Sequence, residues 1–244
     1  MAARLQMRGQ STKKSISQFC TPCTPHPLSA LPPRLRFLLW PPQVSGPSEW
    51  HKLYPIAQGD RQSPINIVSS RAVYDPTLKP LVLAYESCMS LSISNNGHSV
   101  MVEFDDVDDR TVVHGGPLDG PYRLKQFHFH WGKKHSLGSE HTVDGKSFSS
   151  ELHLVHWNGK KYKSFAEAAA APDGLAVVGI FLETGDEHAS MNRLTDALYM
   201  VRFKMEKFRS LLFTAEDDEK VRMVNNFRPP QPLKGRVVQA SFQS

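Results

Sequence analysis

The strongest constraint on this chain is the alternation of polar and aromatic residues at 126–131, where the sequence is Gln-Phe-His-Phe-His-Trp. Side chains of a β-strand point alternately to opposite faces, so the pattern predicts a strand that carries His128 and His130 on one face. The three aromatic residues then lie on the other face, where they fix the strand in a hydrophobic core. We therefore expect a sheet that presents two neighbouring imidazoles.

A second strand is predicted at 151–155, where the sequence is Glu-Leu-His-Leu-Val. The same alternation places Glu151, His153 and Val155 on one face. If this strand neighbours the first, His153 supplies a third imidazole beside the other two. Three histidines with a fourth position left open form the ligand set of a catalytic zinc site.

Two other interpretations of these histidines compete with a metal site. A single buried histidine is more often a hydrogen-bonded core residue than a ligand, but three on separate apolar strands favour metal binding. An iron or manganese cupin site also contains His-x-His, yet it requires a carboxylate four or five positions later. This chain has Lys134 and His135 there, so the cupin interpretation fails.

The rest of the chain predicts one mostly β domain at 49–244 with peripheral helices, an α+β fold. Short β-type segments, separated by Gly, Pro, Asp and Asn, lie at 91–94, 100–104, 122–131, 152–157 and 176–182. Helical patterns are fewer, and they lie at 164–168, 191–200 and 205–213. No apolar run approaches the ~18–20 residues that span a bilayer, so we expect no membrane segment.

The N-terminal residues 1–48 differ from the rest in composition. They contain eight of the 18 prolines and six basic residues but no acidic one, and they predict an irregular extension. The net charge of +5 therefore comes from this extension, and the near-neutral remainder argues against a nucleic-acid partner. An acid-free basic segment also resembles a mitochondrial transit peptide, although its prolines oppose the amphipathic helix that such a peptide needs. The three cysteines, Cys20, Cys23 and Cys88, are too few for a disulfide framework and favour a reducing, cytoplasmic setting.

The motifs around the histidines resemble those of the α-class carbonic anhydrases. Their signature corresponds to Ser-Glu-His-Thr-Val at 139–143, Phe148, and the segment at 151–155. Further family motifs correspond to 62–66, 95–98, 115–118 and 227–233. The resemblance covers 50–204 and 205–242, and the run at 190–199 is closest to a cytosolic vertebrate isozyme. It implies a central twisted, mainly antiparallel sheet.

The resemblance also implies a function, the reversible hydration of CO2 to bicarbonate and a proton by zinc-bound hydroxide. The zinc ligands would be His128, His130 and His153. Each ligand would have a partner that orients its ring. Gln126 would orient His128, the backbone carbonyl of Asn226 would orient His130, and Glu151 would orient His153. The implied enzyme is a monomeric zinc lyase that serves pH and bicarbonate balance and binds sulfonamide and anion inhibitors.

Other residues take family roles in the same way. His98 would carry protons from the site to buffer, and Val155 and Val177 would line the CO2 pocket. Glu140 would accept a hydrogen bond from a threonine that orients the hydroxide. The remaining histidines are interpreted as structural or surface residues: His135, His141, His156 and His188.

The chain departs from the family between Lys204 and Met205, where the family has a further segment. That segment includes a Leu-Thr-Thr-Pro-Pro motif and a tryptophan-bearing strand, and no two consecutive threonines occur in this chain. We expect some sheet strands to be missing and Glu140 to lose its threonine partner. Three hypotheses follow: an active carbonic anhydrase, a zinc-binding form with impaired catalysis, and an interaction module without catalysis. The three retained histidines disfavour the last, and the missing motif favours the second over the first.

Overall fold

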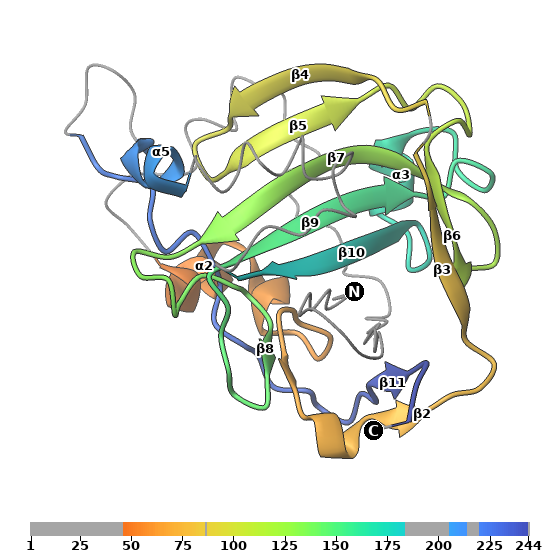
Figure 1. Cartoon of the computed structure of the whole chain (residues 1–244), viewed down its shortest axis with the longest axis horizontal. Helices are drawn as coiled ribbons and strands as arrows, with labels where there is room; N and C mark the ends of the chain where they lie inside the picture. The colour runs from red at the N-terminus through yellow and green to blue at the C-terminus, as the bar shows by residue number, and fades with distance from the viewer. Residues whose placement is uncertain (1–45, 86, 184–204, 214–219, 244) are drawn as a thin grey trace, which may run out of the picture.

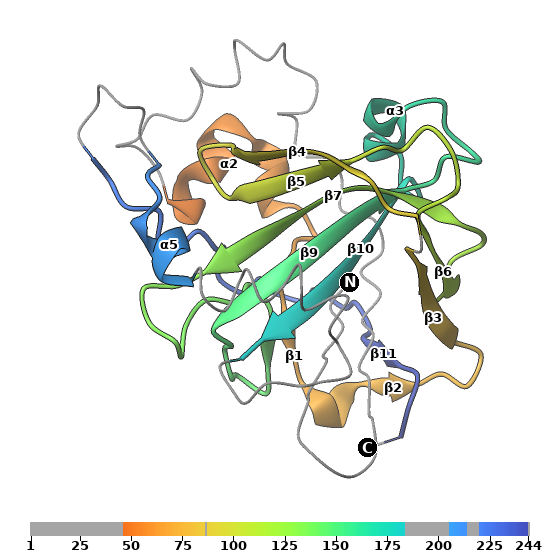
Figure 2. The same cartoon turned by 45° about the horizontal axis from the view of Figure 1, so that its top comes forward.

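A large antiparallel sheet forms the centre of the computed structural model, which describes residues 46–85, 87–183, 205–213 and 220–243 (Figure 1). Within the described residues it has seven strands: β3 (Lys79–Ala84), β4 (Ser90–Asn95), β5 (Val100–Phe104), β6 (Val112–Gly116), β7 (Tyr122–Trp131), β9 (Ser150–Trp157) and β10 (Leu175–Leu182). Five of them lie side by side in the order β10-β9-β7-β5-β4. In Figure 2, β6 and β3 continue from one end of β7 as an antiparallel pair.

Two small parallel pairs and short helices surround this sheet. β1 (Asn66–Ile67) pairs with β8 (Thr142–Val143), and β2 (Val73–Tyr74) pairs with β11 (Gln239–Ala240). The helices are η2 (Pro47–Glu49), α2 (Trp50–Leu53), η3 (Pro55–Gln58), η4 (Ser69–Arg71), α3 (Phe165–Ala169) and α5 (Met205–Ser210). The expected mostly β fold with peripheral helices is confirmed. No helix in the described part of the chain is long and apolar enough to cross a membrane.

A β-bulge in β7 decides which side chains of that strand share a face. Leu124 pairs with His156 and Gln126 with Val155, so β7 has one extra residue, Lys125, opposite β9. The extra residue reverses the alternation. Leu124 and Phe129 consequently pack in the same core although an odd number of positions separates them.

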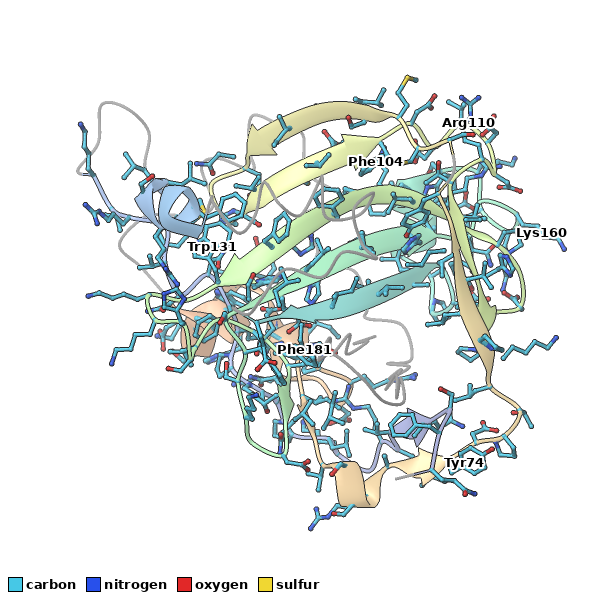
Figure 3. All side chains as sticks on the ribbon, in the orientation of Figure 1. Tyr74, Phe104, Arg110, Trp131, Lys160 and Phe181 are labelled. Atoms are coloured by element: carbon cyan, nitrogen blue, oxygen red, sulfur yellow. The ribbon has the colours of Figure 1, made fainter. Side chains whose placement is uncertain are left out.

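The two faces of the sheet pack into different hydrophobic clusters. The larger cluster contains Phe129 and Trp131 of β7 together with Leu152, Leu154 and Phe208, all buried. The smaller contains Phe148 and Phe181, whose rings stack at a centroid distance of 4.3 Å. Figure 3 labels Trp131 of the first cluster and Phe181 of the second. The face that carries the histidines therefore has apolar packing near one end of the sheet. The three imidazoles are not part of this apolar cluster.

The observed elements differ from the predicted ones mainly at their ends. β5 and β7 have the predicted bounds, α3 is shifted by one residue because Ser164 caps it, and α5 ends at Ser210 rather than at 213. β3 and β6 were not predicted. Three predicted features lie outside the described residues: positions 1–45 of the extension expected at 1–48, the helix expected at 191–200, and Lys204 at the junction. Positions 47 and 48 of the extension lie in η2.

Candidate metal centre

Strands β7 and β9 bring three imidazoles together. His128 pairs directly with His153 across the two strands, and His130 follows two residues after His128 on the same face. Ring centroids are 5.1 Å apart for His128 and His130, 5.3 Å for His128 and His153, and 4.7 Å for His130 and His153. One nitrogen of each ring lies within 4.8 Å of the other two, a spacing that can hold a metal ion.

Each imidazole is oriented by a hydrogen bond from its second nitrogen. His128 Nδ1 lies 2.9 Å from Gln126 Oε1, and His130 Nδ1 lies 2.8 Å from the carbonyl oxygen of Asn226. His153 Nε2 lies 2.7 Å from Glu151 Oε1. Partners of this kind fix the tautomer of a metal-binding histidine and its ring orientation.

These partners determine which ring nitrogen has a lone pair. Amide, carbonyl and carboxylate oxygens accept, so His128 Nδ1, His130 Nδ1 and His153 Nε2 are the donors. The lone pairs are then on the remaining nitrogens, which converge. His130 Nε2 is buried without a hydrogen-bond partner in the described part of the chain. Zn2+ is commonly bound by histidine nitrogens, and this buried nitrogen without a partner lies beside the lone-pair nitrogens of two other imidazoles. The residues present therefore fit a zinc ion.

Burial keeps two of these rings neutral. Removal from water lowers the pKa of His128 well below its usual value, and the neighbouring His130 and His153 lower it further. Burial likewise lowers the pKa of His130, against the opposite influence of Glu140. Neutral imidazole is the form that coordinates a metal, so the site is prepared at neutral pH.

Glu151 is the fully buried anion behind the site. Burial by itself would raise its pKa, but His141 and His153 and their hydrogen bonds lower the pKa well below the usual value. Its Oε2 accepts from the backbone N–H groups of Glu140 and His141 at 2.9 and 2.8 Å. Its Oε1 lies 2.8 Å from His141 Nδ1, in addition to the contact with His153. His141 was expected to be a structural or surface residue, and its contact with Glu151 was not predicted although the signature motif contains it.

Glu140 lies beside two of the three imidazoles, those of His130 and His153. Its Oε2 is 3.4 Å from His130 Nε2 and 3.9 Å from His153 Nδ1. Its Oε1 accepts a hydrogen bond of 2.9 Å from the backbone N–H of Arg228. The side chain of Glu140 is 15% exposed, so it is mostly removed from water.

The other predicted site residues lie around this cluster. Val155 and Val177 are direct cross-strand partners, and both lie on the face of the sheet that carries His153. His98 lies in the loop between β4 and β5, and its carbonyl accepts a bond of 2.9 Å from Asn226 Nδ2. Asn226 thus connects the loop of His98 to His130.

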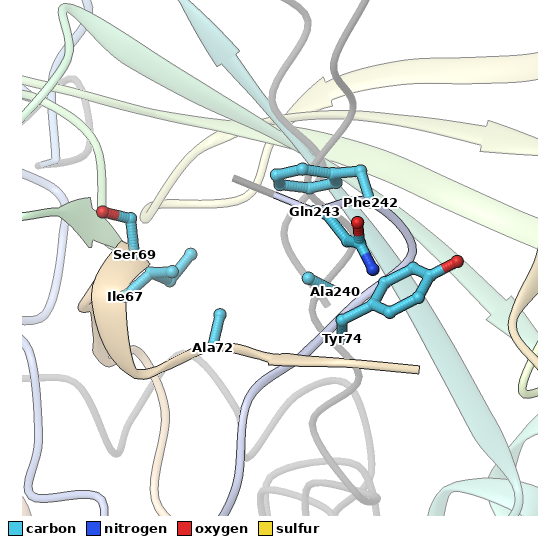
Figure 4. A pocket seen from close by; sticks show the side chains of 7 residues that line it. All are labelled: Ile67, Ser69, Ala72, Tyr74, Ala240, Phe242 and Gln243. Atoms are coloured by element: carbon cyan, nitrogen blue, oxygen red, sulfur yellow. The ribbon is translucent and has the colours of Figure 1, made fainter. Parts of the chain in front are cut away.

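A separate cavity of about 340 Å³ lies at the β2–β11 pair. Ile67, Tyr74 and Phe242 are among the residues that line it (Figure 4). None of the predicted site residues borders this cavity. The chemistry is therefore assigned to the imidazole cluster on the large sheet.

An antiparallel sheet that carries three convergent imidazoles defines a class, the β-sheet proteins with a three-histidine candidate metal centre. The sequence model of eukaryotic-type carbonic anhydrases matches residues 45–206 and 200–242. Human and mouse carbonic anhydrase 7 are each 65% identical to this chain over 254 residues, which cover 83% of this chain and 96% of the relative. Rat carbonic anhydrase 3 is 42% identical over 82% of this chain and 96% of its own length.

The chain therefore belongs to the eukaryotic-type carbonic anhydrase family. Members of this family are carbonic anhydrases, which are lyases, and this chain is an enzyme of that class. The expected resemblance to this family is confirmed, and so is the antiparallel sheet that it implied.

Proposed function

We propose that this chain binds one Zn2+ through His128, His130 and His153 and catalyses the reversible hydration of CO2 to bicarbonate and a proton. The observation that carries the proposal is the convergence of three imidazole nitrogens whose tautomers are fixed by acceptors behind them. When bound, zinc lowers the pKa of a coordinated water to about 7, an effect for which carbonic anhydrase is itself the standard example.

The protein residues have separate roles in this proposal. Gln126, the Asn226 carbonyl and Glu151 hold the three rings in position, and Glu151 also makes His153 a stronger base. Val155 and Val177 present an apolar surface beside His153, which suits the nonpolar CO2 molecule. His98 takes up the released proton and passes it to buffer, since an imidazole can both accept and donate a proton.

Catalysis is proposed to be slower than in the relatives. The chain has no consecutive threonines, so the family's hydrogen-bonding threonine beside Glu140 is absent. Two facts support a missing internal segment at 204/205. The family model matches in two parts that overlap at 200–206. The alignment with human carbonic anhydrase 7 is 254 positions long but covers only 83% of the 244 residues here, so many of its positions are gaps in this chain. The second candidate function is accordingly a zinc-binding form with impaired turnover, and the position of Glu140 beside the imidazoles favours it.

The remaining expectations are kept as proposals. We propose a cytoplasmic monomer that contributes to pH and bicarbonate balance, with the basic extension at 1–48 as the basis for a mitochondrial alternative. One of the relatives, rat carbonic anhydrase 5B, is named as mitochondrial. Sulfonamides and small anions are the expected inhibitors, and the domain is proposed to span 49–244.

Zinc content and CO2 hydration, measured on the same preparation, test the proposal. The parent chain should bind one zinc ion and hydrate CO2 measurably in stopped flow. His130→Ala removes one of three ligands and should abolish tight binding. His135→Ala is the matched control, because this exposed histidine lies outside the cluster. Full zinc occupancy in His130→Ala would overturn the ligand assignment.

A further inference from the structure

Asn226 makes separate contacts through its backbone and through its side chain. Its backbone carbonyl accepts from His130 Nδ1 at 2.8 Å, the contact that orients this imidazole. Its side-chain Nδ2 donates to the carbonyl oxygen of His98 at 2.9 Å and to that of Phe129 at 3.2 Å. Its side-chain Oδ1 accepts from the N–H of Trp131 at 2.7 Å. A substitution can therefore remove the side-chain contacts and keep the backbone carbonyl that serves His130.

The turn that carries His98 is held together by its own hydrogen bonds. Asn96 Oδ1 accepts from the N–H groups of His98 and Ser99 at 2.9 and 2.8 Å. The N–H of Asn96 donates to the Ser99 carbonyl at 3.1 Å, and Gly97 has a φ of 82°, which a residue without a Cβ adopts readily. Because the turn is closed in this way, the place where it is attached to the sheet limits where the imidazole of His98 can lie.

The turn is attached to β7 at Phe129, the residue between the two proposed zinc ligands of that strand. Ser99 Oγ donates to the Phe129 carbonyl at 2.6 Å and accepts from its N–H at 3.0 Å. Asn226 Nδ2 donates to the same carbonyl and also to the carbonyl of His98. The amide therefore bridges the strand of the ligands and the residue that bears the proposed proton carrier.

We propose that Asn226, through its side-chain amide, is a positioning residue that holds His98 at the distance from the metal centre that proton transfer requires. The inference rests on the proposed role of His98 and goes beyond it. The step moves one proton from the site to a ring nitrogen of His98 and one proton from that ring to a buffer base, so Asn226 itself exchanges no proton. Misplacement of a reacting group by about 1 Å can cost on the order of 10²-fold in rate. Proton transfer should therefore depend on the amide, whereas metal binding should not.

Asn226→Asp is the variant that isolates the amide donor. The Asp side chain has the same shape, its oxygen still accepts from the Trp131 N–H, and the backbone carbonyl still serves His130. A carboxylate oxygen cannot donate to the carbonyl of His98, and the two oxygens repel each other.

Asn225→Asp is the matched control. It adds the same charge one residue earlier and keeps an oxygen for the N–H of Lys133, which Asn225 Oδ1 accepts at 2.9 Å. The φ of Asn225 is 59°, a region that Asp also tolerates. An effect of charge alone should appear equally in both variants, whereas an effect of the lost donor should appear only in Asn226→Asp.

NMR of the full-length protein with bound Co2+ measures the position of His98 without measuring catalysis. Paramagnetic Co2+ shifts the signals of nearby C–H groups by an amount that depends steeply on distance and direction, and His98→Ala identifies the signals of this ring. The His98 signals should move in Asn226→Asp and stay in place in Asn225→Asp. The signals of the ligand rings should stay in place in both. Unchanged His98 signals in Asn226→Asp would overturn the inference.

Steady-state CO2 hydration with Zn2+ is the second readout. In dilute buffer, kcat should fall about 10-fold in Asn226→Asp, and kcat/KM, which reports CO2 addition, should fall much less. Concentrated imidazole buffer should restore kcat. The double variant Asn226→Asp/His98→Ala should be no slower than His98→Ala, because the amide acts through His98. Losses that multiply in the double variant would contradict the inference.

The outcomes separate this inference from the proposed function. A parent that binds neither Zn2+ nor Co2+ overturns both. A parent that binds zinc and hydrates CO2, but whose His98 signals are the same in Asn226→Asp, overturns the positioning role alone. Circular dichroism shows whether each variant folds. If Asn226→Asp is unfolded, Asn226→Ser removes the same donor without adding a charge, and its His98 signals and kcat decide in the same way.

Discussion

At the scale of single residues, Glu151 shows how a buried carboxylate can orient a histidine of a candidate metal site. It is fully buried, and ionisation there is costly unless the charge is compensated. Two backbone N–H groups and two imidazoles supply that compensation. Because the same carboxylate orients His153 and holds the backbone of Glu140, one residue positions both a proposed ligand and the carboxylate opposite it.

His98 gives the prediction that belongs to this scale. His98→Ala should slow CO2 hydration in dilute buffer by on the order of 10-fold or more, because a positioned imidazole for proton transfer is lost. Concentrated imidazole buffer should restore the rate, since it accepts the proton directly. Stopped-flow rates at low and high buffer concentration are the measurement. His135→Ala should behave as the parent, and equal rates for parent and His98→Ala in dilute buffer would remove His98 from the mechanism.

At the scale of elements, His156 joins three segments of the sheet. It lies on β9, its Nδ1 is 3.2 Å from the carbonyl of Ala176 on β10, and its Nε2 is hydrogen-bonded to the hydroxyl of Tyr85, which follows β3. Burial lowers the pKa of His156 to about 4, against the opposite influence of its backbone hydrogen bonds. The neutral ring therefore belongs to the folded state.

A pH-dependent loss of stability follows from this pKa. As the pH falls below about 6.5, the unfolded chain binds a proton at this histidine, and the folded chain does not until about pH 4. The contribution of His156 to the free energy of unfolding is fully present above about pH 6.5. Between pH 7 and pH 5, proton binding at this histidine in the unfolded chain lowers the free energy of unfolding by about 2 kcal/mol. Urea unfolding of metal-free protein measures it. The variant His156→Gln should lose less stability than the parent between these pH values. The control variant His114→Gln, at an exposed histidine, should lose as much as the parent. An unchanged loss of stability in His156→Gln would refute the assignment.

The elements also show where sequence patterns are sufficient. The strand at 122–131 was predicted because polar and aromatic residues alternate over 126–131. The bulge at Lys125 was not, since it depends on which residues of β9 lie opposite. β3 was missed because its hydrophobic residues are interrupted by Pro80 and several remain exposed, as Val82 at 43% illustrates.

At the scale of the whole molecule, the large sheet ends on each side in a strand that has no further strand paired to it within the described residues. In the described part of the chain, β4 is the last strand on one side, and its Leu91 and Ile93 are 61% and 72% exposed. β10 is the last strand on the other side. Edge strands with exposed apolar side chains favour association and contribute less burial. These edges agree with the proposal that strands present in the relatives are missing here.

Insertion of the family segment between Lys204 and Met205 should therefore raise both activity and stability. Loss of one preorganised hydrogen-bonding group costs roughly 10²–10³ in rate, about 3–4 kcal/mol. The parent should therefore hydrate CO2 more slowly than the variant with the inserted segment by at least this factor. Sulfonamide affinity and the thermal midpoint of the apo chain should rise as well. An insertion whose first threonine is alanine separates the hydrogen bond from the restored strands. Equal hydration rates with and without the segment would contradict the prediction.

The sequence by itself determined the class of fold and indicated which three histidines would lie close together. Alternation along a strand is a local property, so the common face of His128 and His130 follows from their spacing alone. Orientation of the rings is different, because the acceptor for His130 is a carbonyl 96 positions away. Only tertiary structure decided that contact, the pairing of His128 with His153 and the approach of Glu140 to both His130 and His153. These depend on strand register and on a distant backbone N–H at Arg228, which no local pattern encodes.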